Sequence, residues 1–275
     1  MVDNDPKSFL RSLPASSIQS IEVYTTPPAK YDAEGLGGVI NIVTTKRVGE
    51  GYKGNINLNG AYPNGGPGAG LSFTATHKKF GVELFGGSNL SYNPSVEGST
   101  YRSTTGTAPS TLNVTENTQR NSRGRYIGTQ FSYDIDSLQL LTAQLNFNGS
   151  LNKSKYGRFS QLLAEDETQQ FRQRTDSKGN GNGFDGGLNY QLGIKKDKAK
   201  LLTVSYRYMQ YKTRSNVENA FYDTINYALP DFNQINNTAF IEQTGQVDYV
   251  QNIKKVKMEA GIKAIFRDNN SHFNT

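Results

Sequence analysis

The feature that most constrains this chain is an alternation of apolar and polar residues that recurs in short segments after residue 48. The clearest segment, residues 141–148, reads Leu-Thr-Ala-Gln-Leu-Asn-Phe-Asn. A period of two places successive side chains on opposite faces of a β-strand. We count nine such segments, at about residues 52–62, 71–76, 82–89, 127–133, 141–148, 184–192, 202–208, 245–249 and 256–266. The chain is therefore predicted to be all-β.

The composition suits strands that need only one apolar face. Hydrophobic residues make up 35% of the 275 residues and the mean hydropathy is −0.64, which would leave a soluble core thin for this length. A barrel with a wet interior tolerates such a composition. The 16 Tyr and 14 Phe argue against disorder, and the absence of cysteine excludes disulfides, thiolate metal sites and a cysteine nucleophile. No apolar run approaches the roughly 20 residues of a membrane-spanning helix.

The expected connections between the segments alternate in length. Short turns are predicted near residues 77–81, 134–138, 195–200 and 252–255, and long loops near 94–123, 155–183 and 213–238; only 63–68 is short where a long loop is expected. Outer-membrane barrels combine short periplasmic turns with long extracellular loops. We therefore predict part of an antiparallel transmembrane β-barrel, with about nine strands of a larger barrel, in the bacterial outer membrane.

The net charge of +6 is concentrated in lysines at the predicted short turns. These lysines are expected either to face anionic headgroups of the inner leaflet or simply to keep hairpin ends soluble. Separate turns do not form a stripe, so no nucleic-acid partner is predicted. Six tyrosines near strand ends are candidates for an aromatic girdle, with ordinary strand residues as the alternative: Tyr52, Tyr62, Tyr92, Tyr190, Tyr211 and Tyr249.

The N-terminal region has a different texture. A short helix is predicted from about Pro6 to Leu13, because Asp5 and Pro6 form a helix start. Two β-rich runs follow, Ile21–Thr25 and Val39–Thr44, separated by two prolines and a glycine cluster. Residues 1–48 are thus predicted to be a small α/β unit, and residues 49–275 the strands of the barrel.

The stretch 21–46 closely resembles the C-terminal part of the plug domain of TonB-dependent outer-membrane receptors. There, an Ile-Glu-Val strand leads through proline, tyrosine and a glycine-rich turn into a strand reading Val-Ile-Asn-Ile. The turn, Pro-Pro-Ala-Lys-Tyr-Asp-Ala-Glu-Gly, looks like a branch common in Bacteroidetes. The residues that match the plug motif are Ile21, Glu22, Val23, Pro28, Tyr31, Gly37, Gly38, Val39, Ile40, Asn41 and Ile42.

This resemblance implies a fragment that covers the end of a plug and the first part of a barrel of about 22 strands. It implies a ligand-gated importer of a small substrate, such as a metal–siderophore complex, that is energised by a TonB-type energy-coupling protein. In the family that protein contacts a segment before the plug, which is expected upstream of this chain. The fragment by itself is expected to transport nothing.

Two alternatives stay open: a passive outer-membrane barrel with an adhesin or structural role, and a soluble all-β binding domain. An enzyme is not expected, because no acid, base and nucleophile are spaced for catalysis. No cofactor or metal is predicted either. The match to GxGxxG at residues 181–186 precedes an alternating strand rather than a helix, and His77 and His272 lack ligand-spaced neighbours. Asp176, Asn180, Asn182 and Asp185 carry side-chain oxygens, but they are predicted to lie in a solvated loop and not in a calcium site. The acidic run 165–167 is likewise predicted to be a solvated part of a loop.

Overall fold

The structure is a computed structural model that describes residues 18–24, 39–44, 50–194, 197–253 and 256–275. Within these residues, all regular secondary structure consists of β-strands. The strands are β1 (Ile18–Tyr24), β2 (Val39–Thr44), β3 (Gly51–Gly60), β4 (Pro67–His77), β5 (Phe80–Tyr92), β6 (Val96–Thr104), β7 (Ser110–Asp134), β8 (Gln139–Ala164), β9 (Thr168–Ile194), β10 (Asp197–Ile225), β11 (Phe232–Ile253) and β12 (Val256–Asn274).

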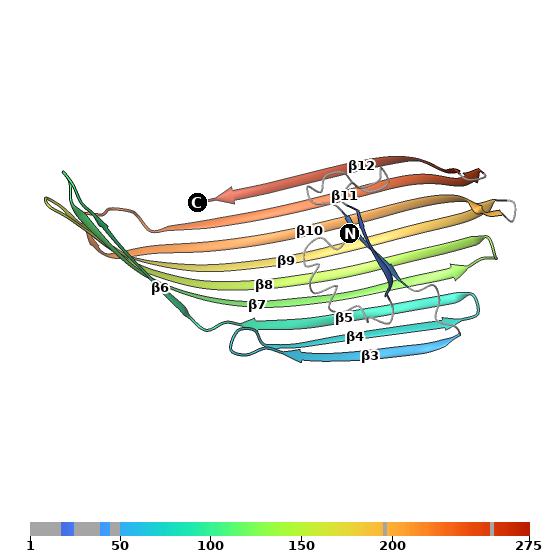
Figure 1. Cartoon of the computed structure of the whole chain (residues 1–275), viewed down its shortest axis with the longest axis horizontal. Helices are drawn as coiled ribbons and strands as arrows, with labels where there is room; N and C mark the ends of the chain where they lie inside the picture. The colour runs from blue at the N-terminus through green and yellow to red at the C-terminus, as the bar shows by residue number, and fades with distance from the viewer. Residues whose placement is uncertain (1–17, 25–38, 45–49, 195–196, 254–255) are drawn as a thin grey trace.

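Ten of the strands form one antiparallel sheet (Figure 1). Its order is β12-β11-β10-β9-β8-β7-β5-β4-β3, so each strand lies beside its neighbour in sequence except at β6. β6 pairs with the first half of β7, while β5 pairs with the second half. The sheet is not closed, and β3 and β12 form its two edges. This meander is the topology of an antiparallel barrel wall.

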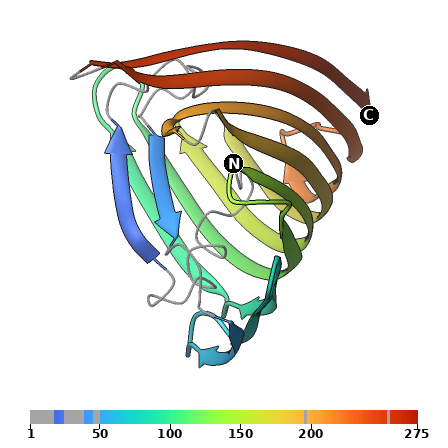
Figure 2. The ribbon, with the colours of Figure 1, turned by 90° about the vertical axis from the view of Figure 1, so that its right-hand side faces the viewer.

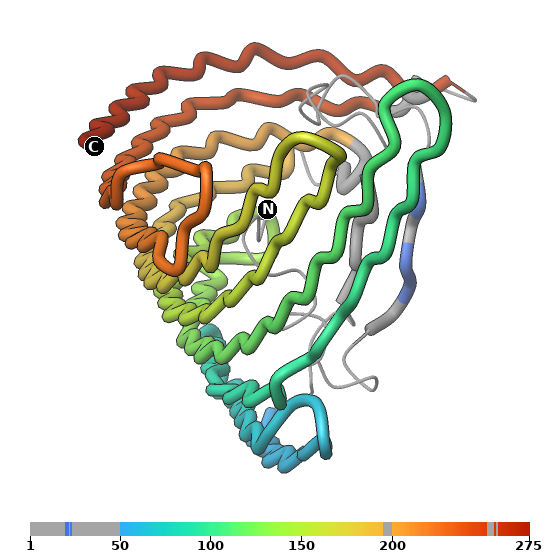
Figure 3. The backbone as a smooth tube through the Cα atoms, turned by 90° about the vertical axis from the view of Figure 1, so that its left-hand side faces the viewer, coloured from blue at the N-terminus to red at the C-terminus, as the bar shows by residue number. Residues whose placement is uncertain are grey.

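The sheet is strongly curved, and Figures 2 and 3 show it from its two ends. β1 and β2 form a separate antiparallel pair, with Ile21 opposite Ile42 and Val23 opposite Ile40. In both views this pair lies on the concave side of the large sheet rather than at one of its edges.

The register places the apolar residues of neighbouring strands on one face. Ile127, Phe147 and Phe184 are consecutive partners across β7, β8 and β9. Large apolar side chains on this face remain exposed, as with Phe147 at 52% and Ile262 at 80%. Leu84 and Phe184 lie on the same face and are half-buried. Together these side chains form what we call the apolar belt: Ile56, Leu71, Phe73, Leu84, Ile127, Phe131, Leu145, Phe147, Phe184, Leu188, Val204, Val247 and Ile262.

The opposite face is polar and more crowded. A Cβ atom placed on Gly128, on the polar face, would lie 2.4 Å from both Asn146 Oδ1 and Phe85 Cζ, whereas on Gly245, on the apolar face, it would meet open space. Side chains converge on the inside of a curved sheet and spread apart on its outside. The polar face is therefore the concave inner wall, and the apolar belt lies on the convex outer face.

The predicted all-β architecture is confirmed, and eight of the nine predicted segments lie within strands: β4, β5 and β7 to β12. The first segment, 52–62, extends two residues past the end of β3 at Gly60. The two N-terminal runs are also strands, the first beginning at Ile18 instead of Ile21. β6 was not predicted. The helix expected from Pro6 to Leu13 lies outside the described residues.

The three long loops were predicted wrongly, because most of residues 94–123, 155–183 and 213–238 is strand. β7, β8, β9 and β10 have 25, 26, 27 and 29 residues, against 10 to 13 in β3, β4 and β5. At about 3.3 Å per residue, β8 is about 86 Å long, far more than a strand needs to cross a membrane. The extra length, here called the overhang, carries many polar residues on both faces and therefore lacks the regular alternation that predicts a strand.

The two ends of the sheet do differ as predicted, but the difference lies in the length of the strands and not in the length of the loops. Connections 78–79 and 135–138 are short, and they lie at the end opposite the overhang (Figure 1). The acidic run 165–167 does connect β8 to β9, but it is a tight turn in which Ala164 N donates to Glu167 O at 2.8 Å.

Candidate functional site: the concave polar wall

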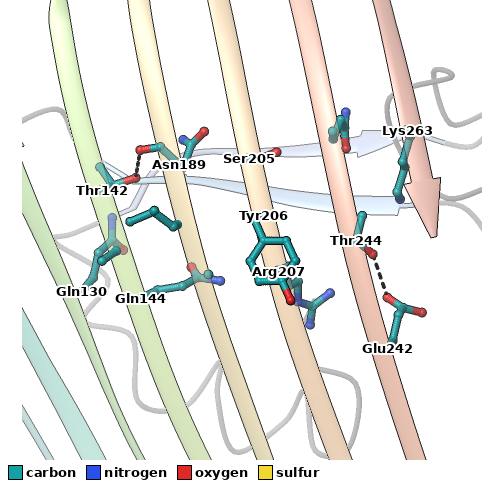
Figure 4. Close-up of a pocket in the computed structure, with 14 residues that line it drawn as sticks. Gln130, Thr142, Gln144, Asn189, Ser205, Tyr206, Arg207, Glu242, Thr244 and Lys263 are labelled. Carbon is teal, nitrogen blue, oxygen red and sulfur yellow. Dashed lines mark hydrogen bonds between the residues drawn. The ribbon is translucent and has the colours of Figure 1, made fainter. Parts of the chain in front are cut away.

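A hollow of about 380 Å³ lies on the inner wall across β7 to β12 (Figure 4). Polar residues at alternate positions of these strands line it because period-two strands turn every second side chain inward. The polar lining residues are Gln130, Thr142, Gln144, Asn189, Ser205, Arg207, Glu242, Thr244, Gln246 and Lys263.

An ion pair joins β9 and β10 at this hollow. Arg207 Nε donates to Asp185 Oδ2 at 2.6 Å, and the Nη2 atom of Arg207 contacts the same oxygen. Gln144 Nε2 donates to the other carboxylate oxygen, Oδ1, at 3.4 Å. Gly187 occupies the register position between Gln144 and Arg207, and its missing side chain leaves room for both to reach Asp185.

A second ion pair joins β11 and β12. Arg267 Nε donates to Glu242 Oε2 at 2.7 Å, and Thr244 Oγ1 donates to Glu242 Oε1 at 3.3 Å. Glu242 is only 7% exposed, so its carboxylate depends on these donors. Along β9 to β12 the paired charges alternate in sign, which makes this part of the wall polar without a strong net field.

Glycines on the inner wall are covered by side chains from neighbouring strands. A Cβ on Gly87 would lie 2.7 Å from Tyr126 Oη, and one on Gly181 would lie 2.6 Å from Tyr211 Oη. The wall therefore presents amide, hydroxyl and charged groups to the concave side with little free space between them.

The inner side of the overhang carries an aromatic cluster. The rings of Phe171 and Tyr227 stack at 4.1 Å between centroids, and Phe221 is 6.1 Å from Phe171 and 6.3 Å from Phe232. The guanidinium carbon of Arg158 lies 5.8 Å from the centre of the Phe171 ring. These residues come from β8 to β11 and from the connection after β10, so the register gathers them at the far end of the wall.

Beside this cluster, Tyr156 Oη donates to Glu116 Oε1 at 2.6 Å, and Arg158 lies 3.7 Å from the same carboxylate oxygen. Burial, followed by the bond to Glu116, raises the pKa of Tyr156 above its usual value of 10.0. The tyrosine therefore stays a neutral donor at physiological pH. Neither this group nor the aromatic cluster was found by sequence reasoning, because their residues are spread over more than 100 positions without a common motif.

The plug-motif residues are partly within the described residues. Ile21, Glu22 and Val23 lie in β1, and Val39, Ile40, Asn41 and Ile42 lie in β2, with Glu22 opposite Asn41. The remaining motif residues, Pro28, Tyr31, Gly37 and Gly38, lie outside the described part of the chain. The motif thus supplies both strands of the pair on the concave side.

The other sequence patterns do not form sites. Residues 181–186 lie entirely within β9, with no helix after them. The assignment of 176–185 to a loop was wrong, and the register turns Asp176, Asn180 and Asn182 outward but Asp185 inward. Among the described residues, no three His, Asp or Glu side chains gather closely enough to hold a metal ion.

The tyrosine girdle is correct only in part. Tyr52, Tyr92, Tyr190 and Tyr249 share the outer face, whereas Tyr211 points to the inner wall and contacts the position of Gly181. In the part of the chain that the structure describes, no helix has the length and apolar character to cross a membrane.

Comparison with known protein families agrees with the geometry. Residues 193–275, which run from the end of β9 through β12, match the family described as outer membrane protein beta-barrel family. The unliganded crystal structure of the ferric citrate transporter FecA is similar with a TM-score of 0.46 and 12% identity, over 96% of this chain and 44% of that chain. This chain therefore spans less than half of that structure. None of the curated proteins compared is significantly similar.

The exposed apolar belt on an antiparallel curved sheet, together with the family match, rules out the soluble binding domain. The chain forms an antiparallel wall of an outer-membrane β-barrel and lies in the bacterial outer membrane.

Proposed function

We propose that this chain is the end of the plug and the first part of the barrel of a TonB-dependent receptor. In this proposal, residues 1–48 obstruct the barrel formed by residues 49–275 and its continuation. A TonB-type energy-coupling protein moves the plug and admits a small substrate, such as a metal–siderophore complex. The whole receptor performs the import, and this segment contributes part of the gate and of the wall.

The observation that carries the proposal is the place of the β1–β2 pair. The pair has the plug-like sequence, from Ile21 to Val23 and from Val39 to Ile42, and it lies on the concave side of the sheet (Figure 2). It faces the side of the sheet that carries hydrogen-bonding groups. A passive barrel used for adhesion has no need of such a segment on that side.

The aromatic cluster at the far end of the inner wall is the candidate ligand contact. Phe171, Phe221, Tyr227 and Phe232 offer ring faces, and Arg158 offers a cation beside them. Aromatic rings and a guanidinium suit a ligand that is itself aromatic or anionic, as many metal chelators are.

Uptake of labelled metal–siderophore complexes tests the energised import. The protein is produced from its whole reading frame in a strain that lacks other receptors for the same complexes. We expect uptake with an intact energy-coupling protein and none without it. Uptake that continues unchanged without energy coupling would overturn the proposal, and complete absence of uptake across a panel of complexes would favour the adhesin alternative.

Deletion of residues 18–44 tests the gate separately. We expect the deletion to let large antibiotics that normally cannot cross the outer membrane enter the cell, because the obstruction is gone. As a matched control, residues 165–167 of the β8–β9 turn are replaced by glycine and serine, which leaves permeability unchanged. Equal permeability of the deletion and the control would contradict the assignment of the pair as a plug.

A further inference from the structure

Beyond the apolar belt, toward the overhang, the outer face becomes strongly basic. Three consecutive rows of register partners across β7, β8, β9 and β10 each contain two cations. The first row is Arg125, Gly149, Asn182 and Lys212; the second is Arg123, Leu151, Asn180 and Arg214; the third is Asn121, Lys153, Lys178 and Asn216. We call the six cations of these rows the basic band.

The basic band contains no opposing charge. The three rows contain no Asp or Glu on these four strands, and all six cations are exposed. In the described part of the chain, none of the six forms an ion pair, although five other arginines do. Carboxylates return only in the next row, with Asp176 and Glu218. The band is thus a localised positive surface on the outside of the barrel wall.

The register fixes the position of the basic band along the strands relative to the apolar belt. The row directly below the band contains Ile127, Phe147 and Phe184 of the belt. The three basic rows then extend over about 13 Å along the strands. Because the headgroup region begins where the hydrocarbon core ends, cations in these rows stand at headgroup level, on the leaflet that borders the overhang.

A hollow of about 490 Å³ opens on the outer face at the β10 edge of the band. Lys212 and Arg214 line it together with amide side chains from β9, β11 and β12, and His272. A phosphate requires only cations, but amides donate and accept hydrogen bonds at once, as sugar hydroxyls require. The lining therefore suits a phosphorylated sugar better than a bare phosphate.

We propose that the basic band is a binding site for the phosphorylated sugar headgroup of an outer-leaflet glycolipid. The acyl chains of the glycolipid lie against the apolar belt, and its phosphates contact the six cations. The side chains of Asn180 and Asn182 meet the sugar at the hollow. This lipid packs against the outside of the barrel, away from the inner wall that the substrate would pass.

Direct binding of purified phosphorylated lipid A tests this site. The protein from its whole reading frame is purified in detergent, and bound lipid is counted by native mass spectrometry over a range of lipid concentrations. The test variant removes three cations: Lys178→Gln, Lys212→Gln and Arg214→Gln. The control variant removes three lysines from the opposite end of the strands: Lys78→Gln, Lys79→Gln and Lys200→Gln.

We expect the test variant to bind phosphorylated lipid A roughly 100-fold more weakly, since each cation near an anionic membrane surface is worth about fivefold in affinity. The control variant keeps the affinity of the unmodified protein within about twofold. Dephosphorylated lipid A binds all three proteins equally weakly. Strand content from circular dichroism and resistance to protease confirm that each variant is folded.

Two outcomes would overturn the proposal. One is equal binding of phosphorylated and dephosphorylated lipid A by the unmodified protein, which would mean that only the acyl chains are recognised. The other is an equal loss of affinity in the test and control variants, which would mean that net charge matters and its position does not.

Discussion

On β8, odd-numbered residues from Leu141 to Phe147 face outward and even-numbered residues from Thr142 to Asn148 face inward, so one backbone serves two environments. The outer side chains have few protein neighbours, and Phe147 remains half exposed. The inner side chains lie against each other across neighbouring strands, as Asn148 does over the position of Gly183. The outer face therefore depends on lipid for its contacts, whereas the inner face depends on the fit of its own side chains.

This difference predicts that the outer face tolerates changes of shape but not added charge, and that the inner face does the reverse. Four substitution experiments test it, from the largest expected effect to the smallest. In the first three, a variant on one face is compared with a matched variant elsewhere, and the fourth changes a turn that lies on neither face.

A charge on the belt should have the largest effect. Leu188→Arg places a cation in the middle of the belt, within the hydrocarbon, and is expected to destabilise the protein by about 2–4 kcal/mol. Asn189→Arg, the next residue on the same strand, points to the inner wall and is expected to cost less than about 1 kcal/mol. Urea denaturation of the protein in lipid bilayers measures both. A similar loss in the two variants would show that the faces are assigned wrongly.

Added side-chain volume should destabilise the inner face more than the outer face, the reverse of the order expected for added charge. A Cβ on Gly87 of the inner wall would lie 2.8 Å from the carbonyl oxygen of Ala69, a backbone atom that cannot turn away. Gly87→Ala is therefore expected to cost about 1–3 kcal/mol. Gly245→Ala on the outer face meets no atom and adds apolar surface toward lipid, so it is expected to be neutral or slightly stabilising. The same denaturation measurement decides, and equal effects would contradict the crowding of the inner wall.

Loss of an inner ion pair should have a smaller effect. Arg267→Gln leaves the Glu242 carboxylate without its arginine, and a cost of about 1–2 kcal/mol is expected because the pair is partly exposed. Lys155→Gln on the outer side of the overhang breaks no ion pair among the described residues and is expected to change stability by less than about 0.5 kcal/mol. If the lysine variant proved the less stable of the two, the inner charges would not be acting as a pair.

The smallest effect belongs to a turn that lies on neither face. Asp136 Oδ1 accepts a hydrogen bond from Leu138 N at 2.8 Å, and Gln139 Nε2 donates to Oδ2 at 2.7 Å. The bond from Leu138, supported by Gln139 and by the charge of Lys79, outweighs a smaller desolvation effect and lowers the pKa of Asp136 below its usual 3.8. A lowered pKa in the folded state adds stability above pH 3.8, and this stability is lost as the pH falls further.

Comparison of the unmodified protein with Asp136→Asn over a pH series measures this contribution. We expect the variant to be slightly less stable at neutral pH and the difference to disappear in acid. A difference that persists unchanged at low pH would mean that the charge of Asp136 plays no part. Neither face should affect the result, which makes the turn a reference for the three larger effects.

The sequence predicted the strands where the two faces differ in polarity. Leu145 and Phe147 alternate with Asn146 and Asn148, so the membrane level of β8 was visible as a pattern. In the overhang, both faces meet water, and a run such as Ser-Lys-Tyr-Gly-Arg-Phe at 154–159 carries no period. The strand there is held by backbone pairing with β7 and β9, which a single segment of sequence does not reveal.

The candidate sites were hidden for a related reason. The basic band assembles Arg123 and Arg214, residues 91 positions apart, through register alone. The inner ion pair Arg207–Asp185 likewise depends on Gly187, which lies in register between Gln144 and Arg207 and leaves room for both side chains. In the sequence, Gly187 is only one of 28 glycines. The plug-like stretch is the exception, because its residues are contiguous enough to form a recognisable motif.

The two edges of the sheet, β3 and β12, carry a consequence for biogenesis. Each edge presents peptide N–H and C=O groups that lack partners on one side, and in hydrocarbon an unpaired peptide group costs several kcal/mol. Strands that enter the bilayer one at a time are therefore unstable there, because their peptide groups lack hydrogen-bond partners. Insertion into the membrane must therefore coincide with backbone pairing along both edges, so that no peptide group of β3 or β12 stays unpaired in hydrocarbon.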